Sequence, residues 1–318
     1  MPTWGEILKE LVDLNKQGNK LPFDDVRRKY LLELSRHTGR NTIIYSTKWT
    51  QPVPFPEFIS ITEEDLQGFM EVFHGLKGPS IDLILHSPGG FAEATEAIVS
   101  YMRKKFQDVR IIIPQAAMSA ATMLSCSANR IVMGKHSSLG PIDPQMTILT
   151  QFGFRTVPAQ TILDQFELAK TDCQDPKKIA PWLPILSQYG PSLLTECQNA
   201  LALSKSLVAK WLESYMFAGN PKSKEIANDI SSKLADNKFF KSHARHIDRD
   251  QAKKMGFIIE DLESDQKFQD LVLSVFHATN HTFDGTPSIK IIENHNGKAF
   301  MKFLQQAPPV APPKQPNP

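Results

Sequence analysis

The sequence predicts an α/β protein built around a sheet of mostly parallel strands, and three observations support this. Residues 41–135 alternate between short β-branched runs and longer helix-like runs. The runs "DLIL" and "IIIP" place apolar residues at consecutive positions, as expected for parallel strands buried on both faces. Small residues and tight turns follow two of these runs directly. Right-handed βαβ crossovers are therefore expected, with loops meeting at the carboxyl ends of the strands.

Two helices are expected in residues 1–40, ahead of the first strand. The first carries an apolar stripe at helical spacing, formed by Trp4, Ile7, Leu8, Leu11 and Leu14. Thr3 is placed to cap it. The run "FDDVRRKYLLELSRHTG" predicts a second helix that ends at Gly39.

The core is expected over residues 41–216. "RNTIIYST" predicts a strand, "ITEEDLQGFMEVFHGLKG" a capped helix, and "SIDLILHSPGG" a strand over 81–85 with a Ser-Pro-Gly-Gly turn. "FAEATEAIVSYMRKKF" then predicts a helix, "DVRIIIP" a strand, "MSAATMLSCSA" a small-residue helix and "NRIVMGK" a strand. Residues 141–160 look like a loop because they carry Pro141, Pro144, Gly153 and Pro158. Residues 161–216 look helical, with an interruption at the Pro-rich run "DPKKIAPWLPILSQYGPS".

Two further regions complete the predicted organisation. Residues 217–305 are expected to form a largely helical C-terminal part, with three short helices around "KSHARHID". The tail over 306–318, "QAPPVAPPKQPNP", is rich in proline and is expected to be disordered.

Composition narrows the function classes. The chain has 36 basic and 34 acidic residues, so a net charge of +2 favours neither nucleic acid nor an anionic membrane as partner. Cys126, Cys173 and Cys197 are too far apart for a CxxC zinc pattern, and a reducing, cytoplasmic location is expected. The first residues do not resemble a signal peptide. No metal site and no cofactor are predicted.

The uncharged stretch "IIIPQAAMSAATMLSCSAN", between Arg110 and Arg130, raises the question of a membrane span. Pro114 ends a strand within it, so the remainder is shorter than the roughly twenty residues a bilayer requires. No transmembrane segment is therefore predicted. Ser119 then stands at the first turn of a buried helix, where free N–H groups can stabilise an oxyanion. From this segment alone, Ser119 could equally be a helix cap.

The "SPGG" turn adds a second feature at the same sheet edge. Gly89 and Gly90 allow a tight turn with exposed backbone N–H groups, close enough for a peptide to approach. Because neighbouring parallel strands end at the same edge, this turn and the turn at Ser119 are expected to lie side by side.

These motifs carry a resemblance to a known superfamily. "SPGG", then "AMSAATM" and "SSLGPIDPQ", resemble the Clp protease/crotonase superfamily over residues 40–160, whose fold has a repeated β-β-α/βαβ core. Within it the chain is most similar to signal peptide peptidase A-like enzymes, and more narrowly to the serine dehydrogenase proteinase family. That narrower similarity continues through "CQNALALSKSLVAKWL" and "KSHARHID" to near residue 300.

The resemblance implies a serine endopeptidase that works through an acyl-enzyme. Ser119 would be the nucleophile, and the backbone N–H groups of Gly90 (or Gly89) and Ala120 would form the oxyanion hole. A peptide or protein substrate would bind as an added strand. The chain would assemble as a homo-oligomer.

The general base is the open part of this prediction. The Clp-type histidine is absent from its expected place, where Asp143 and Pro144 stand. The signal-peptide-peptidase pattern instead implies a lysine, and Lys170 is placed 51 residues after Ser119. A Ser–Lys dyad with Lys170 is therefore predicted, with Lys135, Lys177 and Lys178 as alternatives.

Three further residues are candidates for base or substrate roles: His86 beside the Gly-Gly turn, Asp143 in "GPIDPQ", and His243 in "KSHARHID". Two other functions stay open. One is a non-catalytic scaffold of the same fold that binds peptides. The other is a crotonase-type acyl-CoA enzyme, although its glycine-rich turn is missing where "AMSAATM" stands.

Overall fold

A central β-sheet forms the middle of the structure, and the helices pack against it. The structure is a computed structural model that describes residues 3–304, and in this range seven strands form one sheet in the order β10-β5-β3-β2-β1-β11-β12. Its parallel strands are β1 (Asn41–Thr47), β2 (Ser80–His86), β3 (Asp108–Ile113), β5 (Arg130–Met133) and β10 (Ile259–Asp261). The predicted α/β core and its parallel strands are therefore present.

Helices cover both faces of the sheet. Successive strand residues point to opposite sides, and here the residues on both sides are apolar. Ile43, Leu83 and Ile111 belong to a core shared with α3 (Asp65–Phe73), α4 (Ala92–Lys105) and α5 (Ala120–Ser125). Their neighbours in the chain, Ile44, Ile84 and Ile112, face a second core formed with α2 (Pro22–Thr38) and α12 (Gln266–Gly285). This double burial explains the consecutive apolar residues in the sequence.

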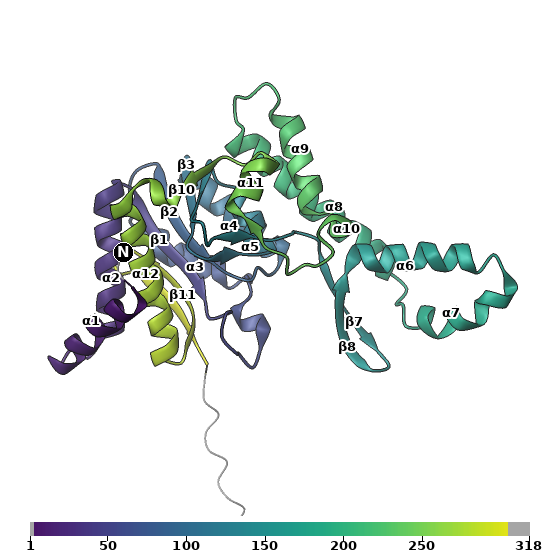
Figure 1. The fold of residues 1–318 in the computed structure, drawn as a ribbon, viewed down its shortest axis with the longest axis horizontal. Coiled ribbons are helices and arrows are strands. Elements are labelled where there is room, and N and C mark those ends of the chain that lie inside the picture. Colours follow the sequence, from purple (N-terminus) through teal and green to yellow (C-terminus); the bar gives the residue numbers. More distant parts are fainter. Residues whose placement is uncertain (1–2, 305–318) are drawn as a thin grey trace, which may run out of the picture.

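The first helices occur as predicted. Helix α1 (Trp4–Lys16) begins with a capping box: the Thr3 hydroxyl accepts from Glu6 N at 3.3 Å, and Glu6 accepts from Thr3 N at 2.6 Å. Helix α2 ends at Gly39, whose φ is 66°. Figure 1 shows α1 and α2 beside α12, at the edge of the molecule opposite α6 and α7.

The C-terminal region is only partly helical, which differs from the prediction for 217–305. Strands β11 (Ser288–Asn294) and β12 (Ala299–Phe303) extend the sheet, and β11 runs antiparallel to β1. The run "SIKIIEN" forms β11 although it contains two charged residues, Lys290 and Glu293, which are rarely buried. Both side chains are fully buried, and both have partners from distant parts of the chain.

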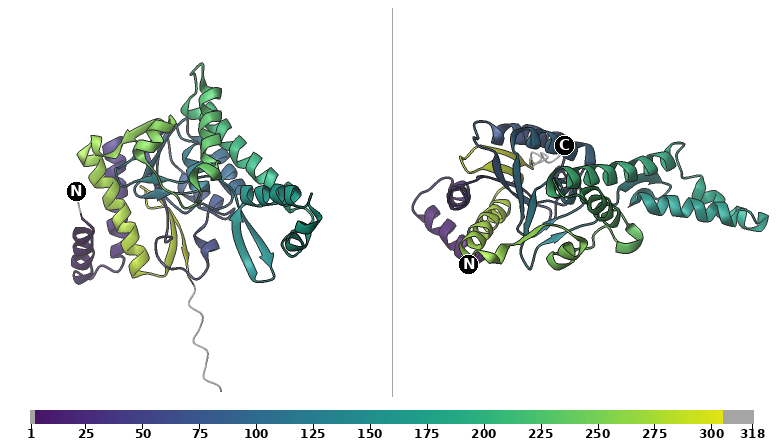
Figure 2. Two further views of the ribbon diagram at one scale, coloured as in Figure 1. Left: turned by 45° about the vertical axis from the view of Figure 1, so that its right-hand side comes forward. Right: turned by 90° about the horizontal axis from the view of Figure 1, so that it is seen from above.

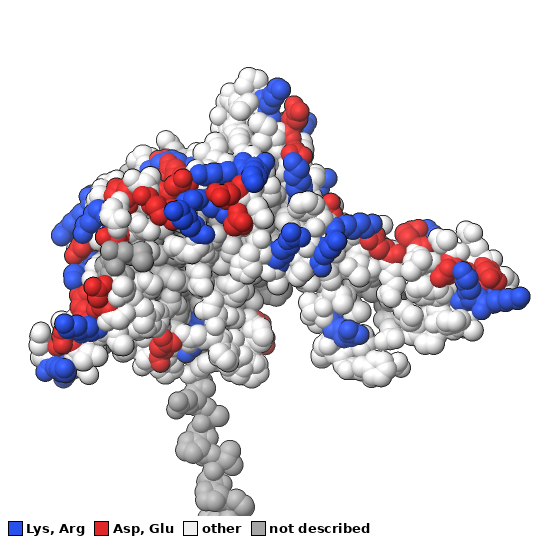
Figure 3. Space-filling view, viewed as in Figure 1, with Lys and Arg blue, Asp and Glu red and all other residues white. Residues whose placement is uncertain are grey.

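Residues 145–203 form an arm that projects from the sheet (Figures 1 and 2), and the chain from Leu207 to Met216 packs back on the core of the sheet. Strands β7 (Gln145–Thr150) and β8 (Gly153–Pro158) form a hairpin where a loop was expected, since the glycine and prolines of this region lie at strand ends. Helical segments follow: α6 (Ala159–Asp172), η2 (Pro176–Lys178), α7 (Ile179–Leu186), α8 (Leu193–Trp211) and the π-helical η3 (Leu212–Met216). Of these, η2 and α7 lie inside the Pro-rich run, where an interruption was expected. Figure 3 shows a hairpin surface with little charge, and Arg155 is its one charged residue.

Smaller elements return the chain from the arm to the sheet. They are α9 (Ser223–Leu234), α10 (Asn237–Phe240), β9 (Ile247–Asp248), α11 (Arg249–Met255) and the 3-10 turns η1 (Pro56–Ile59) and η4 (Leu262–Ser264). A separate three-stranded sheet has the order β4 (Ala116–Ala117), β6 (Ser138–Leu139), β9. The predicted disordered tail over 306–318 lies outside the described residues.

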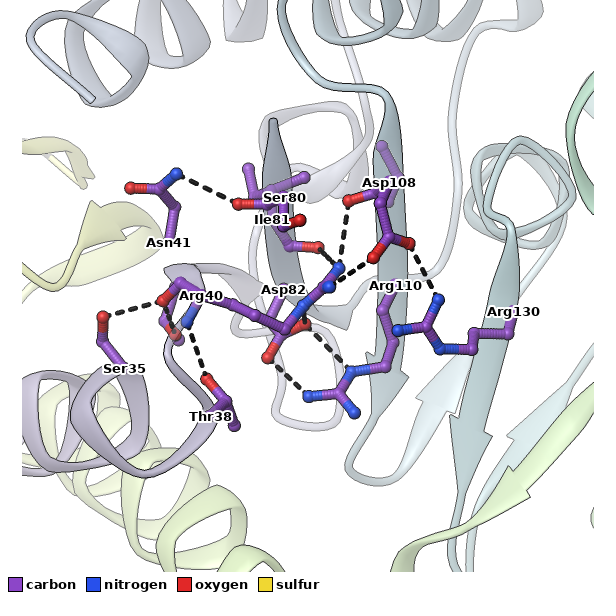
Figure 4. A network of polar contacts seen from close by, with 12 residues as sticks. Ser35, Thr38, Arg40, Asn41, Ser80, Ile81, Asp82, Asp108, Arg110 and Arg130 are labelled. Atoms are coloured by element: carbon purple, nitrogen blue, oxygen red, sulfur yellow. Dashed lines mark hydrogen bonds and ion pairs between the residues drawn. The ribbon is translucent and has the colours of Figure 1, made fainter. Parts of the chain in front are cut away.

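The amino ends of the parallel strands are joined by ion pairs (Figure 4). Arg40 Nε and Arg110 Nη2 bind the two oxygens of the buried Asp82 at 2.6 and 2.7 Å. Asp108 binds Arg40 and also Arg130, the latter at 2.8 Å. Desolvation raises the pKa of Asp108, but the two arginines outweigh it, so its pKa lies below the usual value. The network links Arg40, the residue before β1, to β2, β3 and β5 at the end opposite the predicted site.

Candidate active site

The two turns singled out in the sequence lie side by side and are hydrogen-bonded to each other. They follow β2 and β3, which are parallel neighbours. Ser87 N donates to Ala116 O at 3.2 Å, and Met118 N donates to Ser87 O at 3.0 Å. The turn of residues 87–90 and the turn of residues 116–119 therefore form one rigid unit at the carboxyl edge of the sheet.

Both glycines of the first turn are required by close packing. A Cβ on Gly89, whose φ is +102°, would lie 2.7 Å from Ala120 N and 2.7 Å from Ser119 Cβ. A Cβ on Gly90 would lie 2.3 Å from both N and O of Ile61. No side chain fits in either space, so the glycine backbone itself forms the wall beside Ser119.

Ser119 has an unusual backbone conformation. Its φ is 52° and its ψ is −121°, and it stands immediately before α5 without donating or accepting a side-chain cap bond. Such a conformation costs a non-glycine residue about 1–3 kcal/mol and is found mainly at functional sites. A serine on a sharp, strained strand-to-helix turn exposes its Oγ, as in the nucleophile elbow of α/β-hydrolases. The alternative role of Ser119 as an ordinary helix cap does not fit this geometry.

Two backbone N–H groups beside Ser119 are available to bind a ligand. The N–H of Ala120 is the first amide of α5, so it has no acceptor within the helix. Gly89 O and Phe91 N both bond to Ile61, and because peptide groups alternate along an extended chain, the Gly90 N–H points away from Ile61. The Gly89 N–H instead donates to Ser87 Oγ at 3.2 Å. Gly90 is therefore the better donor of the two glycines.

The three-stranded sheet brings two other predicted residues to this place. Strand β4 pairs in parallel with β6, and β6 pairs antiparallel with β9. Ser119 follows β4, Asp143 follows β6, and His243 precedes β9. All three residues therefore extend from the same end of one small sheet, although up to 124 residues separate them in sequence.

Asp143 and His243 are hydrogen-bonded. Asp143 Oδ1 lies 2.8 Å from His243 Nδ1, and Oδ2 accepts from Asn237 Nδ2 at 2.9 Å and from Gln145 Nε2 at 3.0 Å. The Asp143 side chain is 1% exposed and that of His243 is 26% exposed. A carboxylate only accepts, so Nδ1 is the donor of this bond, and in the neutral imidazole Nε2 is then the nitrogen with the lone pair. The hydrogen bond to Asp143 thereby orients the His243 ring, and a histidine held in this way can act as a general base.

His86, the third predicted candidate, is held in an apolar environment. Its ring is fully buried, with centroids 5.0 Å from Phe276 and 5.4 Å from Trp49. Desolvation lowers the pKa of His86 to about 3, and the backbone of Ala116 opposes this only in part. A base this weak takes up a proton poorly at neutral pH, so the ring packs rather than titrates.

Lys170 is not brought to Ser119 within one chain. It lies near the end of α6, where Figures 1 and 2 show the helix pointing away from α5. Its side chain is 57% exposed and pairs with Glu167 at 2.8 Å. The alternatives Lys135, Lys177 and Lys178 are also exposed. The predicted Ser–Lys dyad therefore stays a prediction that needs a second copy of the chain.

Three residues that hold the site together were not singled out in the sequence. The side-chain amides of Asn237 and Gln145 donate to the Asp143 carboxylate, and the Ser87 hydroxyl accepts a hydrogen bond from the Gly89 N–H. Gln145 could have been found from its place in "GPIDPQ", two residues after Asp143. Asn237 reaches the site only through tertiary structure, because 94 residues separate it from Asp143.

The fold and the site together define a class: an α/β protein with a serine on a strained turn beside a glycine turn. The chain belongs to the family of ClpP-like SDH-type serine proteinases, whose model matches residues 25–274. The predicted family and the predicted Clp protease/crotonase-like fold are thereby confirmed.

Two relatives and one solved structure are similar to this chain at low sequence identity. The uncharacterized protein MJ0137 of Methanocaldococcus jannaschii is 27% identical over 237 residues, which is 74% of this chain and 73% of that protein. The uncharacterized protein MJ1495 of the same organism is 27% identical over 215 residues, 65% of this chain and 64% of that protein, just under two thirds of its length. Among solved structures, a mutant of the 1510-N membrane-bound stomatin-specific protease covers 67% of this chain and 79% of its own, with 15% identity and a TM-score of 0.39.

Two other kinds of site, a membrane span and a metal site, are also relevant to residues 3–304. None of the helices in this range is long and apolar enough to span a bilayer. In the same range, no group of three or more His, Cys, Asp or Glu residues is arranged to hold a metal ion.

Proposed function

We propose that this chain is a serine endopeptidase in which Ser119 is the nucleophile and His243, oriented by Asp143, is the general base. The observation that carries the proposal is the strained Ser119 turn, packed against the Gly89–Gly90 backbone, with the Ala120 N–H at the start of α5 and the Gly90 N–H directed away from Ile61. The Asp143–His243 pair at the same end of the small sheet supports the assignment of the base.

The proposed reaction has two stages. His243 Nε2 accepts the proton of Ser119 Oγ as Oγ attacks the carbonyl carbon of the scissile peptide bond. The N–H groups of Gly90 and Ala120 donate to the resulting oxyanion. The carbon–nitrogen bond then breaks, and the leaving amine takes the proton from His243. In the second stage His243 activates a water that hydrolyses the acyl-enzyme and releases the acid product and free Ser119.

Asp143 has a positioning role in this scheme. Its carboxylate fixes the His243 tautomer and stabilises the imidazolium that forms, while Asn237 and Gln145 hold the carboxylate itself. A peptide or protein substrate, a cytoplasmic location and a homo-oligomeric state are kept as parts of the proposal. In an oligomer, Lys170 of another copy would be the competing base.

The proposal is tested by labelling with a fluorophosphonate, which reacts covalently with an activated serine. Wild type and Ser119→Ala are compared, with Ser125→Ala as a matched control on the same helix, since Ser125 Oγ only donates to Ala121 O. We expect labelling and peptide turnover in wild type and the control, and neither in Ser119→Ala.

Thermal melting confirms that all three proteins are folded. Equal labelling of wild type and Ser119→Ala would overturn the assignment of the nucleophile. Peptide binding without turnover or labelling would favour the non-catalytic scaffold instead.

A further inference from the structure

A short segment, residues 60–62, forms one side of the glycine turn. Ile61 and Gly90 form an isolated parallel bridge, in which Ile61 N donates to Gly89 O at 2.7 Å and Phe91 N donates to Ile61 O at 3.0 Å. These two bonds set the peptide planes on either side of Gly90. They therefore also set the direction of the Gly90 N–H, the proposed oxyanion donor.

The residues flanking Ile61 are each held by one member of a buried ion pair. Lys290 Nζ donates to Ser60 O at 2.7 Å, and Thr62 N donates to Asp65 Oδ2 at 2.9 Å. Lys290 lies on β11 and Asp65 begins α3, so two separate elements fix the segment from both sides. Ile61 itself is fully buried between them.

Tyr45 is hydrogen-bonded to the Lys290–Asp65 ion pair. Lys290 Nζ lies 2.7 and 2.8 Å from the two oxygens of Asp65, and the hydroxyl of Tyr45 donates to Asp65 Oδ2 at 2.9 Å. All three side chains are fully buried. Burial and the Asp65 charge raise the pKa of Tyr45 well above its usual range, so the phenol remains a proton donor.

We propose that Lys290 and Asp65 are positioning residues of the active site: through Ser60 and Thr62 they fix Ile61, and through Ile61 they aim the Gly90 N–H at the oxyanion. The catalytic consequence of this inference rests on the proposed function. The orientation of the Gly90 N–H by Lys290 and Asp65 does not depend on that function. The link is a continuous series of hydrogen bonds from Lys290 and Asp65 to Gly89 and Phe91.

The chemistry of the pair fits a positioning role better than a purely stabilising one. A buried ion pair contributes little net stability, because desolvation of both charges offsets their attraction. An apolar pair would fill the same space but would leave Ser60 O and Thr62 N without partners. The charged groups orient the backbone, because Lys290 binds Ser60 O and Asp65 binds Thr62 N on either side of Ile61.

The experiment compares Lys290→Met with Arg27→Met. Arg27 is a matched control because it is also fully buried and pairs with Glu293, on the same strand as Lys290. Arg27 ties β11 to α2, however, and its partners are Glu293, Thr282 and Asp24 rather than the 60–62 segment. Both substitutions remove a buried charge and keep most of the aliphatic stem.

Two readouts are measured for both variants, below their melting temperatures. Hydrogen exchange of peptides covering residues 58–64 and 86–95 reports whether the Ile61–Gly90 bridge is held. Steady-state kinetics report whether kcat falls while KM is kept, as expected when only transition-state binding is lost. We expect faster exchange and a loss in kcat of about 10–100-fold for Lys290→Met, and neither for Arg27→Met.

The outcomes separate this inference from the proposed function. Equal exchange in the two variants, or faster exchange with unchanged kcat in Lys290→Met, would overturn the positioning role. If wild type showed no serine labelling, the proposed function would fail, and exchange alone would still decide whether Lys290 holds the turn. If Lys290→Met does not fold, Tyr45→Phe removes a single bond to Asp65 and is measured in the same way.

Discussion

The two ends of the parallel strands have opposite chemistry. At the carboxyl ends of β2 and β3, the chain forms turns with a strained serine and backbone N–H groups that are free to bind a ligand. At the amino ends, Arg40, Arg110 and Arg130 are paired with Asp82 and Asp108 (Figure 4). In the proposed function the polar groups at the first end bind substrate, whereas those at the second end are paired with one another. Changes at the first should therefore affect activity, and changes at the second stability.

The largest effect is expected at the carboxyl end, from loss of the proposed base. His243→Ala should lower kcat by about 10²–10⁴-fold, the usual contribution of general acid–base catalysis. Lys170→Ala should leave kcat unchanged, because Lys170 is exposed and paired with Glu167. Both are measured by peptide hydrolysis under saturating substrate.

His246→Ala is the matched control, because His246 is three residues from His243 and bonds to Ser138 Oγ instead of Asp143. Activity lost in Lys170→Ala but kept in His243→Ala would replace the proposed base with a Ser–Lys dyad formed between subunits. Either result shows which polar groups at this end take part in proton transfer.

The same contrast explains what the sequence could reveal. The carboxyl end was readable because its function depends on local residue types: glycines that must turn, a serine after a strand, small neighbours around it. Their positions beside one another followed from strand order alone, since β2 and β3 are adjacent and parallel. Ser119, Gly89 and Gly90 were therefore recognised as one unit.

The charged end and the base could not be read in this way. Arg40 meets Asp82 and Asp108 across 42 and 68 residues, and no spacing in the sequence marks them as partners. Asp143 and His243 were noted separately, but their pairing depends on β9 returning to β6 after the whole arm. Lys170 was chosen by distance along the chain, whereas the arm carries it away from the sheet.

A smaller effect, on stability alone, is expected at the amino end. Asp82→Asn removes the buried carboxylate shared by Arg40 and Arg110, and should lower the free energy of unfolding by about 3 kcal/mol. Denaturant unfolding measures this, and kcat should not change. Glu260→Gln is the control, since Glu260 is 40% exposed and its pairs should contribute less than about 1 kcal/mol. A fall in kcat for Asp82→Asn at full folding would show that the two ends are coupled.

The smallest effect tests whether the carboxyl end stores strain. Ser119→Gly and Ser119→Ala both remove Oγ, but only glycine adopts φ 52° and ψ −121° without strain. Ser119→Gly should therefore be more stable than Ser119→Ala by about 1 kcal/mol, after allowing for the greater unfolded-state entropy of glycine. Denaturant unfolding of the two inactive proteins measures the difference.

The same pair of substitutions at Ser125 provides the reference, because Ser125 is part of the helix proper. There alanine should be the more stable residue, by up to about 1 kcal/mol, since glycine lowers helix stability. Opposite signs at positions 119 and 125 would mean that the strain belongs to the turn and not to α5 as a whole. The same sign at both positions would mean that Ser119 is not strained, and the site would then rest on its hydrogen-bonding groups alone.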